Sequence, residues 1–570
     1  MKNFIDSACV FGAKRLTDGT VRFRLWAPAQ QTVSVAIEPG DVVPMRRSAD
    51  GWFEATASVP DGTRYRYRLA DGSLVPDPAS TEQAQDVHDA SVVGSETFVW
   101  KHPDWRGRPW TEVVLYEVHV GAAGGFVGVR NDLLRLKALG VTAIELMPIA
   151  DFPGKRNWGY DGVLPYAPDR AYGSAQDLKE LIDTAHGLDM MMFLDVVYNH
   201  FGPDGNYLGS YAPQFFRDDV NTPWGPAIDF RRREVRDYFT GNVLMWLTEY
   251  RFDGLRFDAV HAIQEQDWVV EMAATVRATV DRPVHLVLEH HNAASLLRKS
   301  VDAQWNDDGH NVLHVLLTDE HGGYYADYAD EPAAKLAQVL SEGWVYQGET
   351  SAYLKAPRGE PSADLPPYSH VLFLQNHDQI GNRAFGERLT SMVTEAAMEA
   401  AITLQILCPQ IPLLFMGEEV GSQTPFLFFT DHHDALADAV REGRRQEFAG
   451  FAAFSDPEKR ERIPDPNAAG TFAASVPQPC SPARFAFYQH LIALRMREVV
   501  PRLVGTTSLN AKAIGPKAVS AAWRLGDGSR LTIVTNLGTD AVPFDVPAGC
   551  LLFSTGDTSP MTAAYLEVAS

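Results

Sequence analysis

The 570-residue chain has a formal net charge of −23 and a pI near 5.1. This acidity argues against nucleic acids and anionic membrane surfaces as partners, because both favour a basic protein face. No run reaches the ~18 apolar residues that a membrane-spanning helix needs, and Met1–Leu16 lacks the apolar core of a signal peptide. The four cysteines are scattered without metal-binding spacing, so we expect reduced thiols and a cytoplasmic protein.

Residues 1–105 are predicted to form a β-sandwich. Apolar and polar residues alternate along Val21–Trp26, Thr32–Ile37 and Tyr65–Leu69, as they do in strands with one buried face. The first run stops at Ala27-Pro28 and the last at the turn Asp71-Gly72. Short strands separated by turns at this spacing are typical of sandwiches.

Residues 106–498 are predicted to form a (β/α)8 TIM barrel, an α/β fold. Eight apolar runs resemble buried parallel strands: Val113–Val120, Ala143–Met147, Met190–Val197, Gly254–Val260, Val284–Leu288, Val301–Trp305, His370–Leu374 and Ile411–Met416. Helical patterns lie between them, for example Val235–Tyr250 and Thr394–Leu407. Strands alternating with helices over this length indicate a barrel with insertions. We expect the longest insertion, Phe201–Arg232, to help build a binding cleft.

The rest of the chain is predicted to close the barrel and add a small β-domain. Residues 417–480 read as irregular, and we interpret their basic clusters Arg441–Arg445 and Lys459–Arg462 as solvated surface. Helix Pro482–Arg497 would complete the barrel. Short strands then return in residues 499–570, at Val519–Leu525, Leu531–Asn536 and Val542–Val546.

Four polar clusters follow predicted barrel strands and carry the candidate chemistry. They are Asp195–His200, Arg256–Asp258, Glu289–His291 and Gln375–Asp378. The carboxyl ends of barrel strands converge on one mouth, where catalytic residues of this fold lie. Arg256 and Asp258 are two residues apart and share one side of an extended chain. Taken alone, this pair is either a structural ion pair or a nucleophile held ionised.

Carboxylates gathered at one mouth are suited to glycoside hydrolysis, which needs an ionised nucleophile and a protonated acid. Asp258 beside Arg256 fits the nucleophile, and Glu289 among like charges is expected to have the raised pKa of an acid. Asp378 with His377 fits a stabiliser of the transition state, and His200 can donate to the same sugar. Zinc is the competing interpretation of these histidines, but none of the four clusters carries a His-x-x-x-His or similar ligand spacing. We therefore expect no metal and no cofactor.

These four clusters closely resemble the conserved regions of the α-amylase superfamily, glycoside hydrolase family 13. The resemblance implies a retaining double displacement with Asp258 as nucleophile, Glu289 as acid/base and Asp378 as stabiliser. It also implies a sugar-stacking role for Tyr160 and substrate contacts from a set of neighbouring side chains. That set is Arg256, His200, His377, Asn199 and His261. The first 105 residues resemble the immunoglobulin-like module that precedes isoamylase and branching-enzyme barrels.

Further segments resemble the maltooligosyltrehalose trehalohydrolases within this superfamily. The segments are Val163–Pro168, His200–Tyr207, Asn221–Gly225, Trp344–Glu349, Gln375–Arg383 and Thr424–His432. This resemblance implies cleavage of the α-1,4 bond next to a terminal trehalose unit, on a substrate made by a maltooligosyltrehalose synthase. We expect Gln379, Arg383 and Asp431 to contact the trehalose unit. The sequence departs from the family pattern at the glycine-rich Gly121–Val129 and at Leu354–Gly359.

Two alternatives stay open. A 1,4-α-glucan branching enzyme has the same fold and intermediate but transfers the glycosyl group to a sugar hydroxyl. A barrel without catalysis that only binds glycan is the second, and the presence of all three carboxylates argues against it. The N-terminal module could bind sugar or act as a structural lid, and the sequence predicts no oligomeric state.

Overall fold

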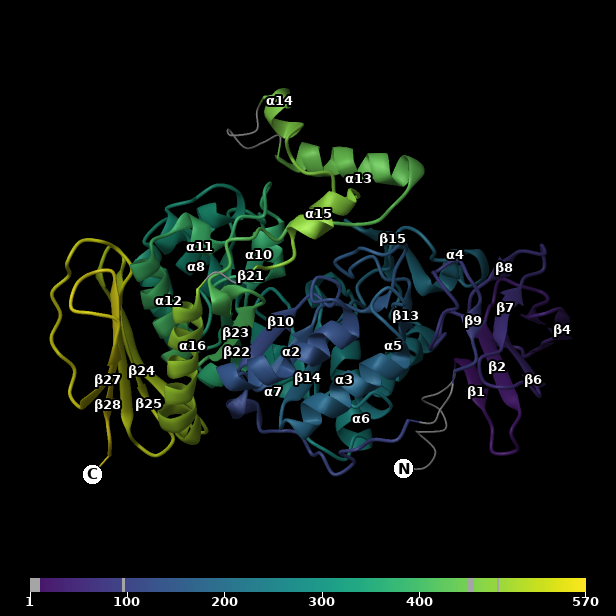
Figure 1. The fold of residues 1–570 in the computed structure, drawn as a ribbon, viewed down its shortest axis with the longest axis horizontal. Coiled ribbons are helices and arrows are strands. Elements are labelled where there is room, and N and C mark those ends of the chain that lie inside the picture. The colour runs from purple at the N-terminus through teal and green to yellow at the C-terminus, as the bar shows by residue number, and fades with distance from the viewer. Residues whose placement is uncertain (1–10, 95–97, 449–455, 479–480, 570) are drawn as a thin grey trace.

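The computed structural model describes residues 11–94, 98–448, 456–478 and 481–569. Along its longest axis lie an N-terminal β-sandwich, a central barrel and a C-terminal antiparallel sheet (Figure 1). One sandwich sheet orders β1 (Gly12–Arg15), β2 (Val21–Trp26), β6 (Trp52–Ala57) and β5 (Arg46–Arg47). The other orders β4 (Asp41–Pro44), β3 (Ser34–Ile37), β7 (Arg64–Arg68) and β8 (Leu74–Val75), with β9 (Ser91–Val92) beside β7.

The closed barrel has eight parallel strands in chain order, which confirms the predicted fold. Each strand lies inside its predicted apolar run. The strands are β10 (Leu115–Val118), β11 (Ala143–Leu146), β14 (Met191–Val196), β17 (Gly254–Phe257), β18 (His285–Leu288), β19 (Ala303–Trp305), β22 (His370–Phe373) and β23 (Ile411–Phe415).

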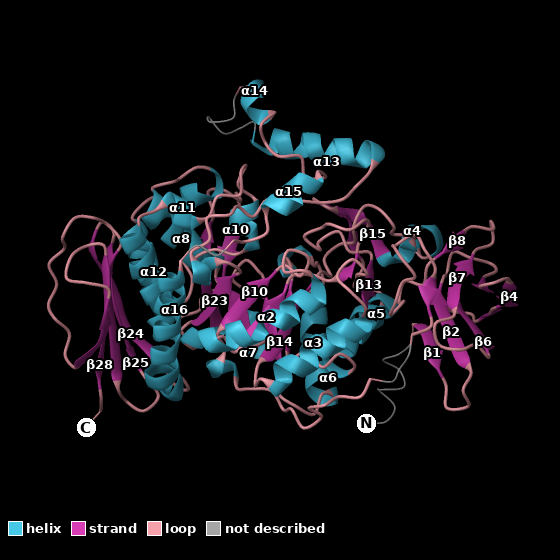
Figure 2. Cartoon of the chain, in the orientation of Figure 1, coloured by secondary structure: helices cyan, strands magenta, loops and turns pink. Residues whose placement is uncertain are grey.

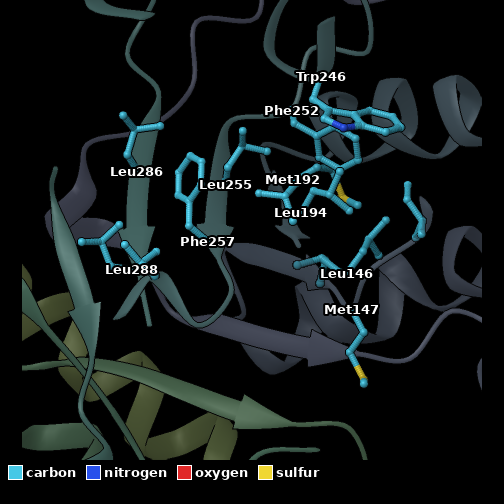
Figure 3. Close-up of a cluster of buried hydrophobic side chains, with 14 of the residues drawn as sticks. Leu146, Met147, Met192, Leu194, Trp246, Phe252, Leu255, Phe257, Leu286 and Leu288 are labelled. Carbon is cyan, nitrogen blue, oxygen red and sulfur yellow. The ribbon is translucent and has the colours of Figure 1, made fainter. Parts of the chain in front are cut away.

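Side chains alternate between the barrel lumen and the surrounding helices. Leu255 and Phe257 of β17, with Leu286 and Leu288 of β18, point outward into a buried cluster that includes Trp246 (Figure 3). Met191, Phe193 and Val287 instead belong to a separate cluster inside the barrel. Two residues further along, the same lumen rows reach Asp195 and Glu289. The lumen is therefore apolar at its amino end and polar at the mouth.

Helices cover the barrel between consecutive strands (Figure 2). They include α2 (Gly125–Leu139), α3 (Ala175–Gly187), α5 (Arg233–Thr248), α6 (Asp267–Thr279), α7 (Ala294–Lys299), α8 (Asp307–Thr318), α9 (Pro332–Glu342), α12 (Glu395–Leu407) and α16 (Pro482–Leu494). Helix α3 begins at a capping box, in which Ser174 accepts from the Asp177 N–H and the Asp177 carboxylate accepts in return. This pairing satisfies amide groups that a helix start leaves free.

The prediction that residues 417–480 are irregular is wrong. This segment contains α13 (Asp434–Glu447), α14 (Pro457–Arg460) and α15 (Ala469–Ala474), which project beyond one end of the barrel (Figure 1). Helix α13 is rich in charged residues, but Leu436 and Val440 stand four residues apart on one face, so an amphipathic helical pattern was present and was not used. Arg444 is buried, which also contradicts the interpretation of its cluster as solvated surface.

The C-terminal sheet has five strands in the order β24 (Thr507–Gly515), β25 (Ala518–Arg524), β26 (Arg530–Asn536), β28 (Met561–Glu567) and β27 (Cys550–Ser554). Two of its strands match predicted runs, but Val542–Val546 is not a strand. Three strands were missed. Strands β24 and β27 lie at the sheet edges and have no buried residue, whereas β28 is buried between β26 and β27.

Two further expectations concern thiols and membranes. Cys408 and Cys550 are free, whereas Cys9, Cys480 and most of the segment examined for a signal peptide lie outside the described residues. Within the described ranges, no helix combines the length and apolarity needed to cross a membrane.

Candidate active site

Arg256 lies at the centre of the barrel mouth and contacts three carboxylates. Its Nη1 donates to Asp195 Oδ2 at 2.6 Å and to Asp258 Oδ1 at 2.9 Å, and its Nη2 donates to Glu289 Oε2 at 2.6 Å. The side chain is 1% exposed and stacks over the Trp305 ring, 4.1 Å from the centroid. One buried cation therefore orients residues from three neighbouring strands.

The strand register explains this convergence. Asp195 on β14 pairs with Arg256 on β17, so both occupy one level of the lumen. Gly254 leaves room for the Phe193 ring, because an added Cβ would lie 2.1 Å from that ring. After Asp258 the chain turns through Ala259 in a left-handed conformation, with φ of 40°. This turn aims the Ala259 N–H at Glu289 Oε2, 3.0 Å away.

Asp258 and Glu289 have opposite pKa shifts. Burial raises the pKa of Asp258 well above its usual range, by more than Arg256 lowers it. Burial also disfavours ionised Glu289, but Arg256, His261 and the Ala259 N–H outweigh it and lower the Glu289 pKa to about 2. The expectation of a raised Glu289 pKa and an ionised Asp258 is therefore wrong here. The reason is that Glu289 shares the arginine and receives a backbone N–H as well.

His377, which follows the seventh barrel strand, lies between Glu117 and Tyr160. Its Nδ1 bonds to Glu117, a buried residue of β10, and its Nε2 lies 2.9 Å from the Tyr160 hydroxyl. Burial lowers the His377 pKa, but the Glu117 charge and hydrogen bond prevail and raise it to about 9. The Tyr160 hydroxyl donates to Asp195 Oδ2 at 2.6 Å, and its ring stacks on His377. Tyr160 and His377 thus join the strand-three and strand-seven clusters.

Asp378 presents its carboxylate to the mouth. It is the second residue of the short helix α10 (His377–Gly381), and its side chain is 42% exposed. Its Oδ1 accepts from Asn382 Nδ2 at 3.1 Å and lies 3.7 Å from His377 Nε2. A ligand can reach this carboxylate without displacing a buried partner.

Five more residues complete the rim. Asn199 Nδ2 donates to Asp258 Oδ2 at 2.7 Å. The His200 ring stacks on Trp224, whose side chain is half exposed, with centroids 4.9 Å apart. His261 stacks on His291 with centroids 3.8 Å apart. Burial lowers the pKa of both His200 and His261, so both are neutral near pH 7 and able to donate or accept one hydrogen bond per nitrogen.

Three residues expected to contact the trehalose unit already have protein partners. Gln379 Oε1 accepts from the Asn376 N–H and caps α10. Arg383 pairs with Glu320 at 2.7 Å and with Glu387 at 3.2 Å. Asp431 accepts from the Lys155 N–H and pairs with Arg156. These contacts hold loops around the mouth.

The sequence analysis missed two buried acids that lie beneath this site. Glu117 and Glu145 share one register level on β10 and β11, and each is at most 1% exposed. Burial, together with Glu117 and Asp195, raises the pKa of Glu145 well above its usual range. The available signal was a single glutamate inside an otherwise apolar strand, which is costly to bury without a purpose. Among the described side chains, no group of three or more His, Cys, Asp or Glu could hold a metal ion.

Comparisons with known families match all three parts of the chain. The family "Alpha amylase, catalytic domain" matches residues 110–219. "Carbohydrate-binding module 48 (Isoamylase N-terminal domain)" matches residues 10–87, and a domain family of unknown function, DUF3459, matches residues 506–566.

Whole-chain relatives narrow the assignment. The Malto-oligosyltrehalose trehalohydrolase of Deinococcus radiodurans is 39% identical over 97% of this chain and 94% of its own. That of Saccharolobus solfataricus is 40% identical over 77% of this chain and 80% of its own. The crystal structure of a Salmonella typhimurium protein designated an alpha amylase superimposes with a TM-score of 0.92 at 41% identity, covering 98% of this chain and 99% of that one. The chain belongs to the malto-oligosyltrehalose trehalohydrolase family of α-amylase-type glycosidases.

Proposed function

We propose that this protein is a retaining glycoside hydrolase that cuts the α-1,4-glucosidic bond next to the terminal trehalose unit of maltooligosyltrehalose. The products are trehalose and a shortened maltooligosaccharide. The observation that carries the proposal is the single Arg256 guanidinium bonded to both Asp258 and Glu289. It fixes a nucleophile and an acid/base on neighbouring strands, and the family relationship supplies the substrate.

The reaction proceeds in two displacements at the anomeric carbon. Asp258 attacks this carbon while Glu289 donates its proton to the departing trehalose oxygen, and the C–O bond breaks. Glu289 then takes a proton from water, whose oxygen attacks the same carbon and releases Asp258. Asp378 and His377 bind sugar hydroxyls more tightly as positive charge develops in the ring.

The pKa order sets a condition on the first displacement. Burial raises the pKa of Asp258, whereas Arg256 and His261 lower that of Glu289. The first displacement needs the reverse order, because Asp258 must be ionised to attack and Glu289 must be protonated to act as acid. A change in the Glu289–Arg256 contact on substrate binding would favour protonated Glu289, because Arg256 is the largest of the influences that lower its pKa.

Incubation with maltotriosyltrehalose tests the proposal. We expect trehalose and maltotriose as products, with little cleavage of maltopentaose. Proton NMR of the fresh products should show the α-anomer of maltotriose first, as retention requires. Equal cleavage of both substrates would contradict the trehalose specificity. A change in iodine staining of amylose without new reducing ends would indicate the branching reaction instead.

The Asp258→Asn variant tests the nucleophile. We expect turnover to fall at least ~10³-fold, because the amide cannot form the glycosyl ester. Asp281→Asn, at a largely exposed position, serves as the matched control and should keep wild-type turnover. Full activity of Asp258→Asn would contradict the mechanism. It would not affect which products are formed, because the incubation with maltotriosyltrehalose identifies them separately.

A further inference from the structure

Arg444 of helix α13 is buried against the segment that follows Asp378, the candidate stabiliser. Arg444 Nη2 donates to the Gly381 carbonyl at 2.6 Å and to the Arg383 carbonyl at 3.0 Å. Its guanidinium lies 5.5 Å from the Phe428 ring centroid and 4.7 Å from that of Phe448. Arg444 is 8% exposed, and its remaining partner is Glu447 at 2.8 Å. Removing this side chain would take the Arg444 donor from the Gly381 carbonyl and would leave the Arg383 carbonyl with the Gly386 N–H at 3.3 Å.

The two carbonyls flank a residue that touches Asp378. Asn382 lies between Gly381 and Arg383, and its amide Nδ2 donates to Asp378 Oδ1 at 3.1 Å. The placement of the Asn382 side chain follows from the backbone on either side of it. Arg444 donates hydrogen bonds to the backbone on both sides of Asn382 and so restricts where the Asn382 side chain lies. The Asn382–Asp378 hydrogen bond extends this restriction to the Asp378 carboxylate.

The same backbone also packs against Trp158. A Cβ added at Gly381 would lie 1.9 Å from the Trp158 ring, so the backbone and the ring are in close contact. The Trp158 ring also meets His377 edge-on, with centroids 5.5 Å apart. Further along, Ala384 packs with Phe448 and Ile463 from the projecting segment. Residues 377–384 therefore pack against both Trp158 and the projecting segment that contains α13.

We propose that Arg444 is a positioning residue that holds Asn382, and through it Asp378, in the orientation needed for transition-state stabilisation. The projecting segment built on α13 is then a working part of the active site, through the backbone that Arg444 holds and through the Arg444 charge, which also acts on Asp378. The inference rests on the proposed function, because it assumes that Asp378 acts in catalysis. A carboxylate free to turn would lose its alignment with the sugar hydroxyls, and misplacement of about 1 Å is enough to cost 10²-fold in rate.

The Arg444→Gln variant tests the proposal, with Arg445→Gln on the same helix as the matched control. Glutamine keeps an uncharged amide NH2 group. It is shorter than arginine and cannot donate charge-assisted hydrogen bonds to both carbonyls. We expect kcat to fall roughly 10- to 100-fold with KM changed less than about 3-fold, because the lost alignment acts in the transition state. Arg445→Gln should retain wild-type kcat. Wild-type kcat in folded Arg444→Gln would overturn the proposal.

A double-mutant cycle with Asn382→Ala separates positioning from a general structural role. Asn382 is exposed, so its replacement should leave the fold intact. If Arg444 acts through Asn382, the double variant should be no slower than the slower single variant. Multiplicative losses would contradict transmission through Asn382. If Arg444→Gln fails to fold, Arg444→Lys takes its place in the same cycle, with the same two outcomes.

Substrate choice keeps this test distinct from that of the proposed function. Each variant is measured on maltotriosyltrehalose and on maltopentaose. A wild-type enzyme that releases no trehalose would refute the proposed function. The kcat comparison on whichever glucan is cleaved would still decide the role of Arg444.

Discussion

Arg256 shows how one residue organises the mouth. Its planar guanidinium reaches Asp195, Asp258 and Glu289 at once, a geometry that an ammonium group cannot reproduce. We expect Arg256→Lys to reduce kcat at least ~10²-fold, because at least one of the three carboxylates loses its partner and changes protonation. Steady-state kinetics, with circular dichroism as the folding control, measures this effect. Wild-type kcat would show that the fork geometry is dispensable.

The Glu117–His377 pair predicts a pH effect on stability. The Glu117 charge, acting against burial, raises the His377 pKa from 6.5 to about 9 in the folded protein. Because the folded state binds the proton more tightly, this contribution is fully present below about pH 6.5 and is lost as pH rises through about 9. Its full size is about 3 kcal/mol, at 1.36 kcal/mol per pKa unit.

Glu117→Gln should remove that contribution. Thermal unfolding of wild type and variant from pH 6 to pH 9.5 is the measurement. We expect the difference in Tm between them to be largest at pH 6 and to shrink toward pH 9.5. A constant difference would show that Glu117 does not hold the proton on His377.

At this scale the sequence predicted positions better than energies. Asp258, Glu289 and Asp378 lie at the barrel mouth, as expected for polar residues that follow apolar strands of a predicted barrel. The pKa order of Asp258 and Glu289 was predicted wrongly, because it depends on burial of Asp258 and on how Arg256, His261 and the Ala259 N–H are placed around Glu289. Such contacts are set by the fold, including a left-handed turn at Ala259, and the residue types do not reveal them.

At the scale of elements, the first residue of strand β17, Gly254, has no room for a side chain. A methyl group at Gly254 would lie 2.1 Å from the Phe193 ring, inside the closed barrel. We expect Gly254→Ala to destabilise the protein by about 1–3 kcal/mol through overpacking and to shift Arg256 and Asp258. Lower Tm together with lower kcat is the expected result.

Helix α13 offers the opposite substitution. An added Cβ at Gly443 meets nothing within 4 Å, and the residue lies inside the helix. Gly443→Ala should therefore stabilise α13 by about 0.5–1 kcal/mol through helix propensity and leave kcat unchanged. Thermal unfolding measures both glycine variants side by side. A loss of stability in Gly443→Ala, or none in Gly254→Ala, would contradict the packing argument.

The elements predicted most accurately from sequence were the barrel strands, which are buried on both faces. They are largely apolar, with single charged residues such as Glu117 and Arg256, because helices cover them outside and side chains fill the lumen inside. Among the missed elements, α13 and the edge strand β24 are mostly exposed, and the edge strand β27 has no buried residue. Strand β28 was missed although it is buried between β26 and β27, so exposure accounts for only some of the missed elements.

At the scale of the whole molecule, hydrogen bonds and buried side chains join the C-terminal sheet to the helices of the barrel. Trp523 on β25 is 1% exposed and donates to the Leu340 carbonyl of α9 at 3.1 Å. Thr562 on β28 donates to the Ala400 carbonyl of α12 at 2.8 Å. We expect Trp523→Ala to cost about 3–5 kcal/mol and to lower the Tm of barrel and sheet together in one calorimetric transition. A separate low-temperature transition would show that the sheet unfolds alone.

The N-terminal module contacts the insertion after the third barrel strand. Ala29 N–H donates to the Tyr211 carbonyl at 3.1 Å, and Gln30 Nε2 donates to the Ser210 carbonyl at 3.1 Å. These contacts support a structural role for the module beside any role in sugar binding. We propose domain boundaries near residues 105 and 498, and limited proteolysis that cuts first at these points would support them.

The shared guanidinium of Arg256 has a consequence for how variants of this enzyme are interpreted. Asp195, Asp258 and Glu289 compete for one cation, so neutralising any of them strengthens the hold of Arg256 on the other two and redistributes their protons. The kinetic effects of Asp195→Asn, Asp258→Asn and Glu289→Gln are then not independent quantities, and their logarithms should not add in the double variants. A ranking of these residues by single substitution would measure how the triad readjusts and would not partition catalysis among its members.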